Sequence, residues 1–140
     1  MKPSTPLAAY QKFLEEFCNG RFELADELVS ADFLIHVAGG ASMAMLGPDG
    51  LRALLRGARS PFSSLIFRID VGPLVQGDLV AARWWADGIY AGGFPGAKAP
   101  AGTPVHFGGH DFLRFRDGRF VEYWGGADDG HVMSQLGMLP

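Results

Sequence analysis

The sequence has a single cysteine, no long apolar run and no excess of basic residues, and each of these absences excludes a class of protein. Cys18 alone cannot form an internal disulfide or a zinc site built from several cysteines. No stretch approaches the roughly 20 consecutive apolar residues that a membrane-spanning helix needs. The first residues also lack the apolar core of a signal peptide. We therefore expect a cytoplasmic protein that does not bind membranes.

Positive charge is too sparse for a nucleic-acid-binding surface. The 12 Lys and Arg residues are outnumbered by 15 Asp and Glu residues, and the basic residues are scattered rather than clustered. The four histidines have no H-x-x-x-H spacing on an expected helix. No glycine-rich loop joins an expected strand to an expected helix, as a phosphate cradle requires. We expect no nucleic acid, no metal and no cofactor.

The composition is that of a folded protein with a large apolar interior. Hydrophobic residues make up 48% of the 140 residues and charged residues 19%. This length suits one domain with one core, spanning residues 1–140. Eleven Phe and three Trp are enough to fill that core or to line an apolar cavity.

Helical patterns dominate the first part of the chain. Apolar residues from Leu7 to Phe17 recur at helical spacing, so one face of a first helix points inward. Ser4 or Thr5 is the expected N-cap, and Gly20 suits the end of that helix. The expected elements are a helix over 4–20, a shorter helix over 21–30, an extended segment over 31–40 and a helix over 47–60.

The second part of the chain is rich in β-branched and aromatic residues, which predicts strands. Strands are expected within 60–77, 78–94, 103–115 and 120–126, and a last helix within 128–137. Residues 91–104 form a Gly- and Pro-rich loop, which we expect at a cavity mouth. Helices followed by antiparallel strands predict an α+β fold. We expect a cone-shaped α+β barrel, in which the N-terminal helices pack on a strongly curved, mostly antiparallel sheet that encloses an apolar pocket.

His110 and Asp111 must face opposite sides of the sheet, because side chains alternate along a strand. Asp117 and Gly118 predict the turn that follows. A two-residue turn puts Asp111 on the same face as Glu122, whereas a bulge at Gly118 reverses every assignment. Which of His110 and Asp111 faces the pocket therefore stays open.

The C-terminal part of the chain resembles the SnoaL-like polyketide cyclases, a group within the NTF2-like, cystatin-like α+β superfamily. The matching residues are Arg114, Asp117, Gly118, Glu122, Trp124, Asp128, Gln135, Leu136 and Gly137. Weaker similarities extend over nearly the whole chain. The motif is specific for the group but not for a reaction, because this fold hosts many functions.

The resemblance implies a function for Asp128. In the cyclases, the acid at this position is the general acid/base of an intramolecular aldol ring closure. The cyclases also use a histidine on the preceding strand, where this chain has Arg114, with His110 and His106 further back. The resemblance also implies a homodimer formed through the outer face of the sheet.

We therefore hypothesise a cofactor-independent enzyme that acts on a hydrophobic, carbonyl-containing small molecule by cyclisation, isomerisation or dehydration. An epoxide-opening hydrolase and a non-catalytic ligand-binding module are the alternatives. Asp128 is expected to point inward, with Asp129 as the helix cap, although Asp128 is itself a good capping residue. The candidate catalytic residues are Asp128, His110 and His36. The candidate substrate-binding residues are Tyr10, Trp84, Tyr90, Phe94, Arg114 and Trp124.

Overall fold

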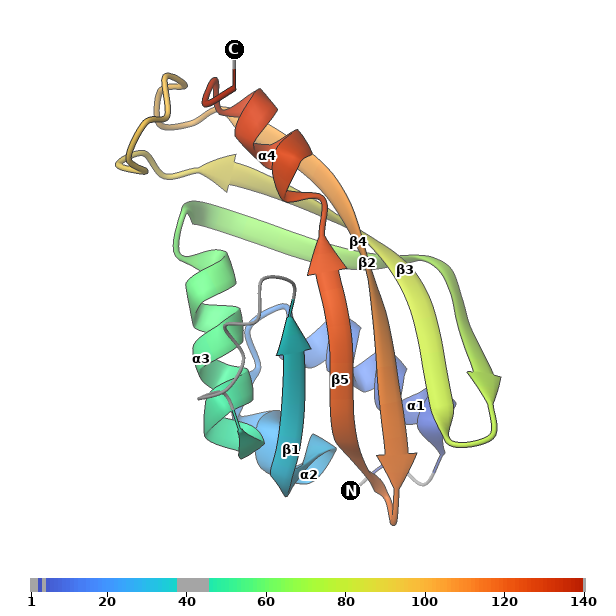
Figure 1. Ribbon diagram of the computed structural model, residues 1–140. Coiled ribbons are helices and arrows are strands. Elements are labelled where there is room, and N and C mark those ends of the chain that lie inside the picture. Colours follow the sequence, from blue (N-terminus) through green and yellow to red (C-terminus); the bar gives the residue numbers. More distant parts are fainter. Residues whose placement is uncertain (1–2, 4, 38–45, 140) are drawn as a thin grey trace.

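Helices and one strand come first along the chain, four more strands follow and a helix comes last, in the order that the sequence patterns predict (Figure 1). The computed structural model describes residue 3, residues 5–37 and residues 46–139. Its helices are α1 (Pro6–Lys12), α2 (Ala25–Leu28), α3 (Gly47–Arg59) and α4 (Asp129–Gln135), with a π-helical segment Phe13–Phe17 and a 3₁₀ turn Phe22–Leu24. Its strands are β1 (Val29–Val37), β2 (Phe62–Gln76), β3 (Leu79–Tyr90), β4 (Pro104–Arg116) and β5 (Arg119–Ala127). None of the described helices is long and apolar enough to cross a membrane.

The first helix begins as its sequence predicts. The Thr5 hydroxyl accepts a hydrogen bond from the Ala8 amide at 3.2 Å, and Pro6 occupies the first turn, where its missing N–H costs nothing. Ser4, the alternative cap, lies outside the described residues. The helix continues into the π-helical segment, and the inward face of the two carries Tyr10 and Phe13, which are both buried.

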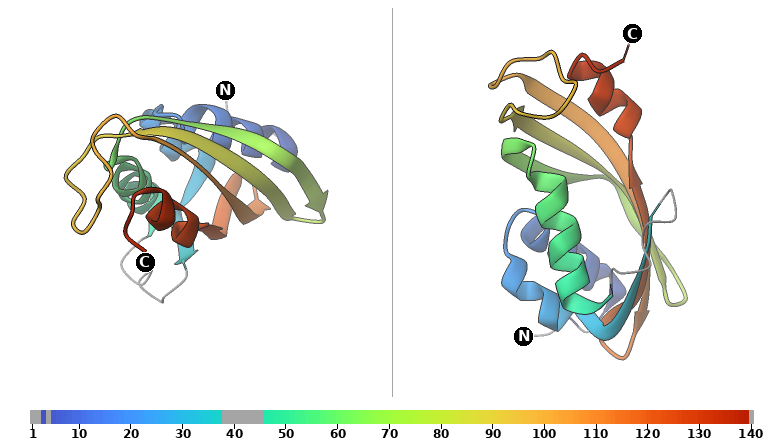
Figure 2. Two further views of the ribbon diagram at one scale, coloured as in Figure 1. Left: turned by 90° about the horizontal axis from the view of Figure 1, so that it is seen from above. Right: turned by 60° about the vertical axis from the view of Figure 1, so that its left-hand side comes forward.

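The five strands form one sheet in the order β1-β5-β4-β3-β2. Strands β2 to β5 are antiparallel neighbours, and β1 pairs in parallel with β5. The sheet is open, since β1 and β2 are its two edges. Helix α3 contacts both edge strands and so covers the gap between them. The right-hand view of Figure 2 shows α1, α2 and α3 gathered on the concave side of the bent sheet.

The β4–β5 hairpin closes with a two-residue turn. Arg116 pairs with Arg119 across it, and Asp117 and Gly118 both have positive φ, at 53° and 83°. Positive φ at both positions is the requirement of a type I′ turn, which Asp-Gly meets more readily than most residue pairs. The turn follows the sequence prediction.

The register of the hairpin then shifts by one residue. Arg114 already pairs with Glu122, which leaves Val121 as an extra residue in β5. Because of this bulge, Asp111 shares the inner face with Tyr123 rather than with Glu122. The grouping of Asp111 with Glu122 that an unbulged two-residue hairpin predicts therefore does not form.

Candidate active site

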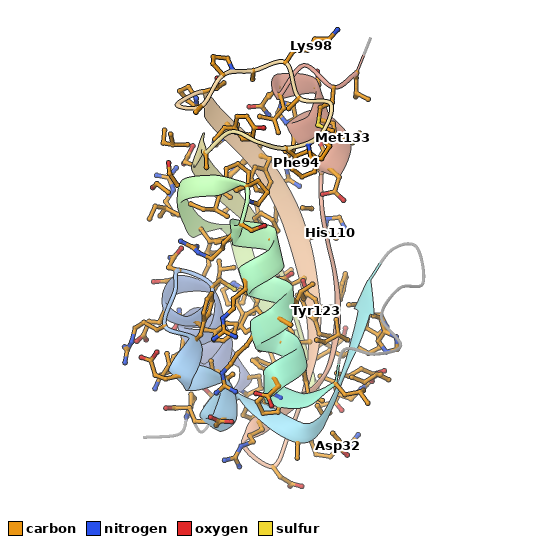
Figure 3. The ribbon with its side chains drawn as sticks, turned by 90° about the vertical axis from the view of Figure 1, so that its left-hand side faces the viewer. Asp32, Phe94, Lys98, His110, Tyr123 and Met133 are labelled. Carbon is orange, nitrogen blue, oxygen red and sulfur yellow. The ribbon has the colours of Figure 1, made fainter. Side chains whose placement is uncertain are left out.

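A cavity of about 640 Å³ lies between the concave face of the sheet and the helices. It extends from the buried end of the first helix to the loop 91–103 and α4. In Figure 3, Phe94 and Met133 lie toward the loop end and Tyr123 lies further along the molecule, and all three line the cavity. The lining is mostly aliphatic and aromatic: Phe13, Leu14, Cys18, Leu54, Leu55, Gly57, Ala58, Pro61, Phe62, Leu65, Phe67, Trp84, Phe94, Phe107, Asp111, Tyr123, Gly125, Gly126, Ala127, Asp129, Val132, Met133, Leu136 and Met138.

Asp111 is the buried charged residue in the lining of this cavity. Its side chain points inward from β4, and the residue is only 2% exposed. One carboxyl oxygen, Oδ2, accepts a hydrogen bond from the Tyr10 hydroxyl at 2.8 Å. The other, Oδ1, accepts one from the Tyr123 hydroxyl at 2.9 Å. A carboxyl group is thus held at a fixed orientation in an apolar enclosure.

Burial raises the pKa of the Asp111 carboxyl above its ordinary value, because the charged form loses its hydration. Hydrogen bonds from Tyr10, Tyr123 and Trp84 favour the charged form and act in the opposite direction. Burial and the charge of Asp111 also raise the pKa of both tyrosine hydroxyls, so these remain protonated donors. A carboxyl tuned in this way inside a cavity is a candidate for acid/base chemistry.

Two glycines make room for the ring side chains around Asp111. A Cβ on Gly125 would lie 1.9 Å from the Tyr123 hydroxyl oxygen, so the tyrosine reaches Asp111 only because position 125 has no side chain. A Cβ on Gly109 would lie 2.2 Å from the Trp84 indole and 2.6 Å from the Gly126 carbonyl oxygen. The indole of Trp84, which lines the cavity, therefore depends on Gly109 in the same way.

Asp128 and Asp129, at the start of α4, have exchanged the roles that the sequence predicts for them. Asp128 is exposed, and its Oδ1 accepts a hydrogen bond from the His131 amide at 3.1 Å, so Asp128 is the N-cap of α4. Asp129 lines the rim of the cavity. The expectation that Asp128 points inward and Asp129 caps the helix is wrong, because the chain leaves β5 in a conformation that turns the Asp128 side chain back onto the α4 amides.

Four other candidate residues lie on the outer face of the sheet. His110 is exposed, because its neighbour Asp111 faces inward. His36 Nε2 lies 2.8 Å from Glu122 Oε2, and its ring stacks on Trp124. Arg114 lies over the same indole and forms ion pairs with Asp78 and Glu122. None of His110, His36, Arg114 and Trp124 is among the described residues that line the cavity.

The remaining candidates lie on the cavity side. Trp84 and Phe94 line the cavity, as a substrate-binding role requires. The Tyr90 hydroxyl accepts a hydrogen bond from the Phe94 amide at 2.7 Å, so Tyr90 anchors the loop and does not itself reach the cavity. The Tyr10 hydroxyl donates a hydrogen bond to Asp111 from α1, and Tyr10 is fully buried.

Sequence reasoning left the orientation of Asp111 open and missed Tyr123. A usable signal was present in β4, where Val105, Phe107 and Leu113 are apolar and all stand an even number of residues from position 111. This alternation marks the inward face and includes position 111. Tyr123 was detectable only with the bulge at Val121, for which the sequence has no clear marker.

The open α+β cone and the apolar cavity between its sheet and helices define the NTF2-like fold. The SnoaL-like polyketide cyclase family matches residues 8–136, so the chain belongs to that family. No curated protein is significantly similar to the chain in sequence.

Three solved structures illustrate the relationship. IdmH of Streptomyces antibioticus, a candidate polyketide cyclase, is 29% identical, with a TM-score of 0.82 over 95% of this chain and 99% of its own. A candidate polyketide cyclase of Acidithiobacillus ferrooxidans is 22% identical, with a TM-score of 0.83 over the full length of both chains. AclR of Streptomyces galilaeus, a candidate hydroxylase, is 22% identical, with a TM-score of 0.79 over 95% of this chain and 85% of its own. The last two show the fold alone.

Proposed function

We propose that the protein is a cofactor-independent acid/base enzyme that acts on a hydrophobic, carbonyl-containing small molecule, with Asp111 as the acid/base. The observation that carries the proposal is an almost fully buried carboxyl group, that of Asp111, in the wall of an apolar cavity. Such a cavity binds a ligand through its apolar surface and orients it through a few polar groups. The only other lining carboxylate among the described residues, Asp129, is exposed at the rim.

The proposed step is a proton transfer at a carbon next to a carbonyl group. The Asp111 carboxylate takes the proton, the electron pair of the C–H bond forms the enolate, and the oxygen gains negative charge. The protonated carboxyl then returns the proton to carbon or to oxygen. This step is common to aldol cyclisation, isomerisation and dehydration, and a positioned acid/base typically accelerates it by about 10²- to 10⁴-fold.

Family membership supports a polyketide-like substrate without defining the reaction. IdmH is named a candidate cyclase and AclR a candidate hydroxylase, so similar folds accompany different chemistries. We propose ring closure as the reaction, because an enolate formed inside the cavity is held close to other carbons of the same folded ligand chain. The apolar lining accommodates such a chain along its length.

A non-catalytic binding module is the second candidate, and one observation favours it. Both oxygens of Asp111 already accept hydrogen bonds, as those of a purely structural carboxylate would. An epoxide-opening hydrolase has less support, because it needs a base beside the acid and no histidine is among the described lining residues.

The two candidates are separated by hydrogen–deuterium exchange of 2-tetralone, a neutral bicyclic ketone, followed by ¹H NMR in D₂O. An acid/base enzyme accelerates loss of the signal from the protons next to the carbonyl, and Asp111→Asn removes the acceleration. Binding of 2-tetralone with equal exchange rates in the wild type and in Asp111→Asn would support the binding module instead.

We also propose a homodimer through the outer face of the sheet. A row of residues in register crosses that face over all five strands: Leu74, Ala81, Phe112, Trp124 and His36. Leu74 is 68% exposed and Phe112 48% exposed. Exposed apolar side chains on one face favour an interaction surface. The cytoplasmic location stays a prediction from the sequence.

A further inference from the structure

The two tyrosines that hold Asp111 have unequal access to the cavity. Tyr123 lines it, whereas Tyr10 is 0% exposed and is not among the lining residues. Tyr123 reaches the carboxyl from β5 and lines the cavity, whereas Tyr10 reaches it from α1 and is covered by the surrounding core. A ligand in the cavity can therefore replace one of these hydrogen bonds but not the other.

We infer that Tyr123 is a catalytic residue whose hydroxyl donates a hydrogen bond to the carbonyl oxygen of the ligand, and that Tyr10 is a positioning residue for Asp111. This inference rests on the proposed function. In the proposed reaction the Tyr123 hydroxyl stabilises the negative charge that develops on the carbonyl oxygen, whereas Tyr10 only orients the Asp111 carboxyl.

The geometry assigns the two roles through the two carboxyl oxygens. The Tyr123 hydroxyl lies 2.9 Å from Oδ1, and transfer of its hydrogen bond to a ligand oxygen frees Oδ1 to accept a proton. The carbon next to the carbonyl is two bonds from that oxygen and therefore lies close to Oδ1. Tyr10 keeps its 2.8 Å hydrogen bond to Oδ2 throughout, so the carboxylate does not rotate away.

The electrostatics fit a donor that keeps its proton. The proton from carbon goes to Asp111, the charge goes to the enolate oxygen, and the Tyr123 O–H bond stays intact. Burial raises the pKa of Tyr123 well above that of a free tyrosine, which keeps the hydroxyl protonated. In an apolar cavity a neutral hydroxyl directed at developing negative charge is an effective stabiliser of the transition state.

The inference is tested with 2-tetralone carrying ¹³C at its carbonyl carbon. A hydrogen bond to the oxygen shifts the carbonyl ¹³C signal downfield, and this readout does not depend on catalysis. The chain has three tyrosines, so Tyr123→Phe and Tyr10→Phe are compared with Tyr90→Phe. The Tyr90 hydroxyl accepts a hydrogen bond from the Phe94 amide and does not reach the cavity. We expect the downfield shift in the wild type, Tyr10→Phe and Tyr90→Phe, and its loss in Tyr123→Phe.

The kinetics of exchange separate the two roles further. Tyr123→Phe is expected to lower kcat by about 10²-fold, as removal of an oxyanion donor does, with a smaller change in KM. Tyr10→Phe is expected to move the pH of half-maximal rate upward, because the ionised carboxylate loses a hydrogen bond, and to leave the rate at high pH within a few-fold of the wild type. Circular dichroism shows whether each variant is folded.

The outcomes distinguish this inference from the proposed function. Retention of the downfield shift in Tyr123→Phe, or its equal loss in Tyr10→Phe, would overturn the inference even if exchange depends on Asp111. A downfield ¹³C shift that is lost in Tyr123→Phe, together with exchange rates that are equal in the wild type and Asp111→Asn, would overturn the proposed function. The hydrogen bond from Tyr123 to the ligand would still be supported. Failure of 2-tetralone to bind the wild type would contradict both.

Discussion

Gly125 leaves the space that the Tyr123 hydroxyl occupies on its way to Asp111. A side chain of even one carbon at position 125 would lie 1.9 Å from the hydroxyl oxygen and 2.2 Å from the ring carbon that bears it. The missing side chain, the bulge at Val121 and the buried carboxyl thus form one arrangement. Each part is needed to place a hydroxyl and a carboxyl side by side in an apolar cavity.

Gly125→Ala is therefore expected to destabilise the protein through overpacking, by about 1–3 kcal/mol in the free energy of unfolding. Gly126→Ala is the matched control on the same strand, because its Cβ would have no heavy atom within 4 Å. Urea denaturation measures both. In the background of Tyr123→Leu the cost of Gly125→Ala should largely vanish, since the ring is gone. Equal costs of Gly125→Ala with and without the tyrosine ring would contradict the assignment.

The raised pKa of Asp111 predicts a pH dependence of stability. Above the ordinary value of 3.8 the unfolded chain releases the Asp111 proton while the folded chain still holds it. The unfolded state then binds fewer protons, so stability falls as the pH rises through the folded-state pKa. The contribution of Asp111 to the free energy of unfolding is fully present below pH 3.8 and is lost above the folded-state pKa. The loss is about 1.4 kcal/mol for each unit by which the folded-state pKa exceeds the unfolded value.

Urea denaturation of the wild type and of Asp111→Asn from pH 4 to pH 8 measures this effect. The stability of the wild type relative to Asp111→Asn should decrease as the pH rises, because the asparagine does not titrate and all other groups are shared. A difference that is constant with pH, or that increases, would show that the folded-state pKa is not raised.

The cavity should prefer neutral ligands to anions. No basic side chain is among the described lining residues, and a carboxylate would lose its hydration next to Asp111. We expect 2-acetonaphthone to bind more tightly than 2-naphthoate at pH 8 by about tenfold or more, which corresponds to about 1.4 kcal/mol. Isothermal titration calorimetry measures both affinities. Asp111→Asn should reduce the difference between the affinities for 2-acetonaphthone and 2-naphthoate. Equal affinities in the wild type would show that the cavity does not disfavour anions.

The proposed dimer is tested by a charge on its outer face. Phe112→Asp places a carboxylate in the middle of the row that crosses the sheet, and we expect it to halve the mass measured by light scattering. Leu7→Asp is the control, because Leu7 is 44% exposed on α1, away from that face. A monomeric wild type, or a Phe112→Asp variant that remains dimeric, would rule out this interface.

Much of the fold follows from local sequence patterns. Thr5 and Pro6 predict the start of the first helix, and Asp117-Gly118 predicts a hairpin turn with positive φ angles, which the structure contains. These features depend on a few neighbouring residues and on backbone sterics. The family resemblance likewise rests on residues that stand at fixed spacing, and it is confirmed over residues 8–136.

The site was harder to predict because it depends on long-range register. One extra residue at Val121 determines which β5 side chain meets Asp111, and the bulge has no strong sequence marker. Asp128 and Asp129 are equivalent by composition, and only the direction in which the chain leaves β5 decides which of them caps α4. The motif therefore drew attention to Asp128, while the buried carboxyl lies on the neighbouring strand.

The measurement that tests the central claim most directly compares two carboxyl groups. Exchange of 2-tetralone in D₂O is followed for the wild type, Asp111→Asn and Asp128→Asn under the same conditions. The buried position of Asp111 and the capping role of Asp128 predict loss of exchange in Asp111→Asn, by about 10²-fold or more, and a near-wild-type rate in Asp128→Asn. Loss of exchange in Asp128→Asn with Asp111→Asn unaffected would contradict this account and return the catalytic role to the end of β5.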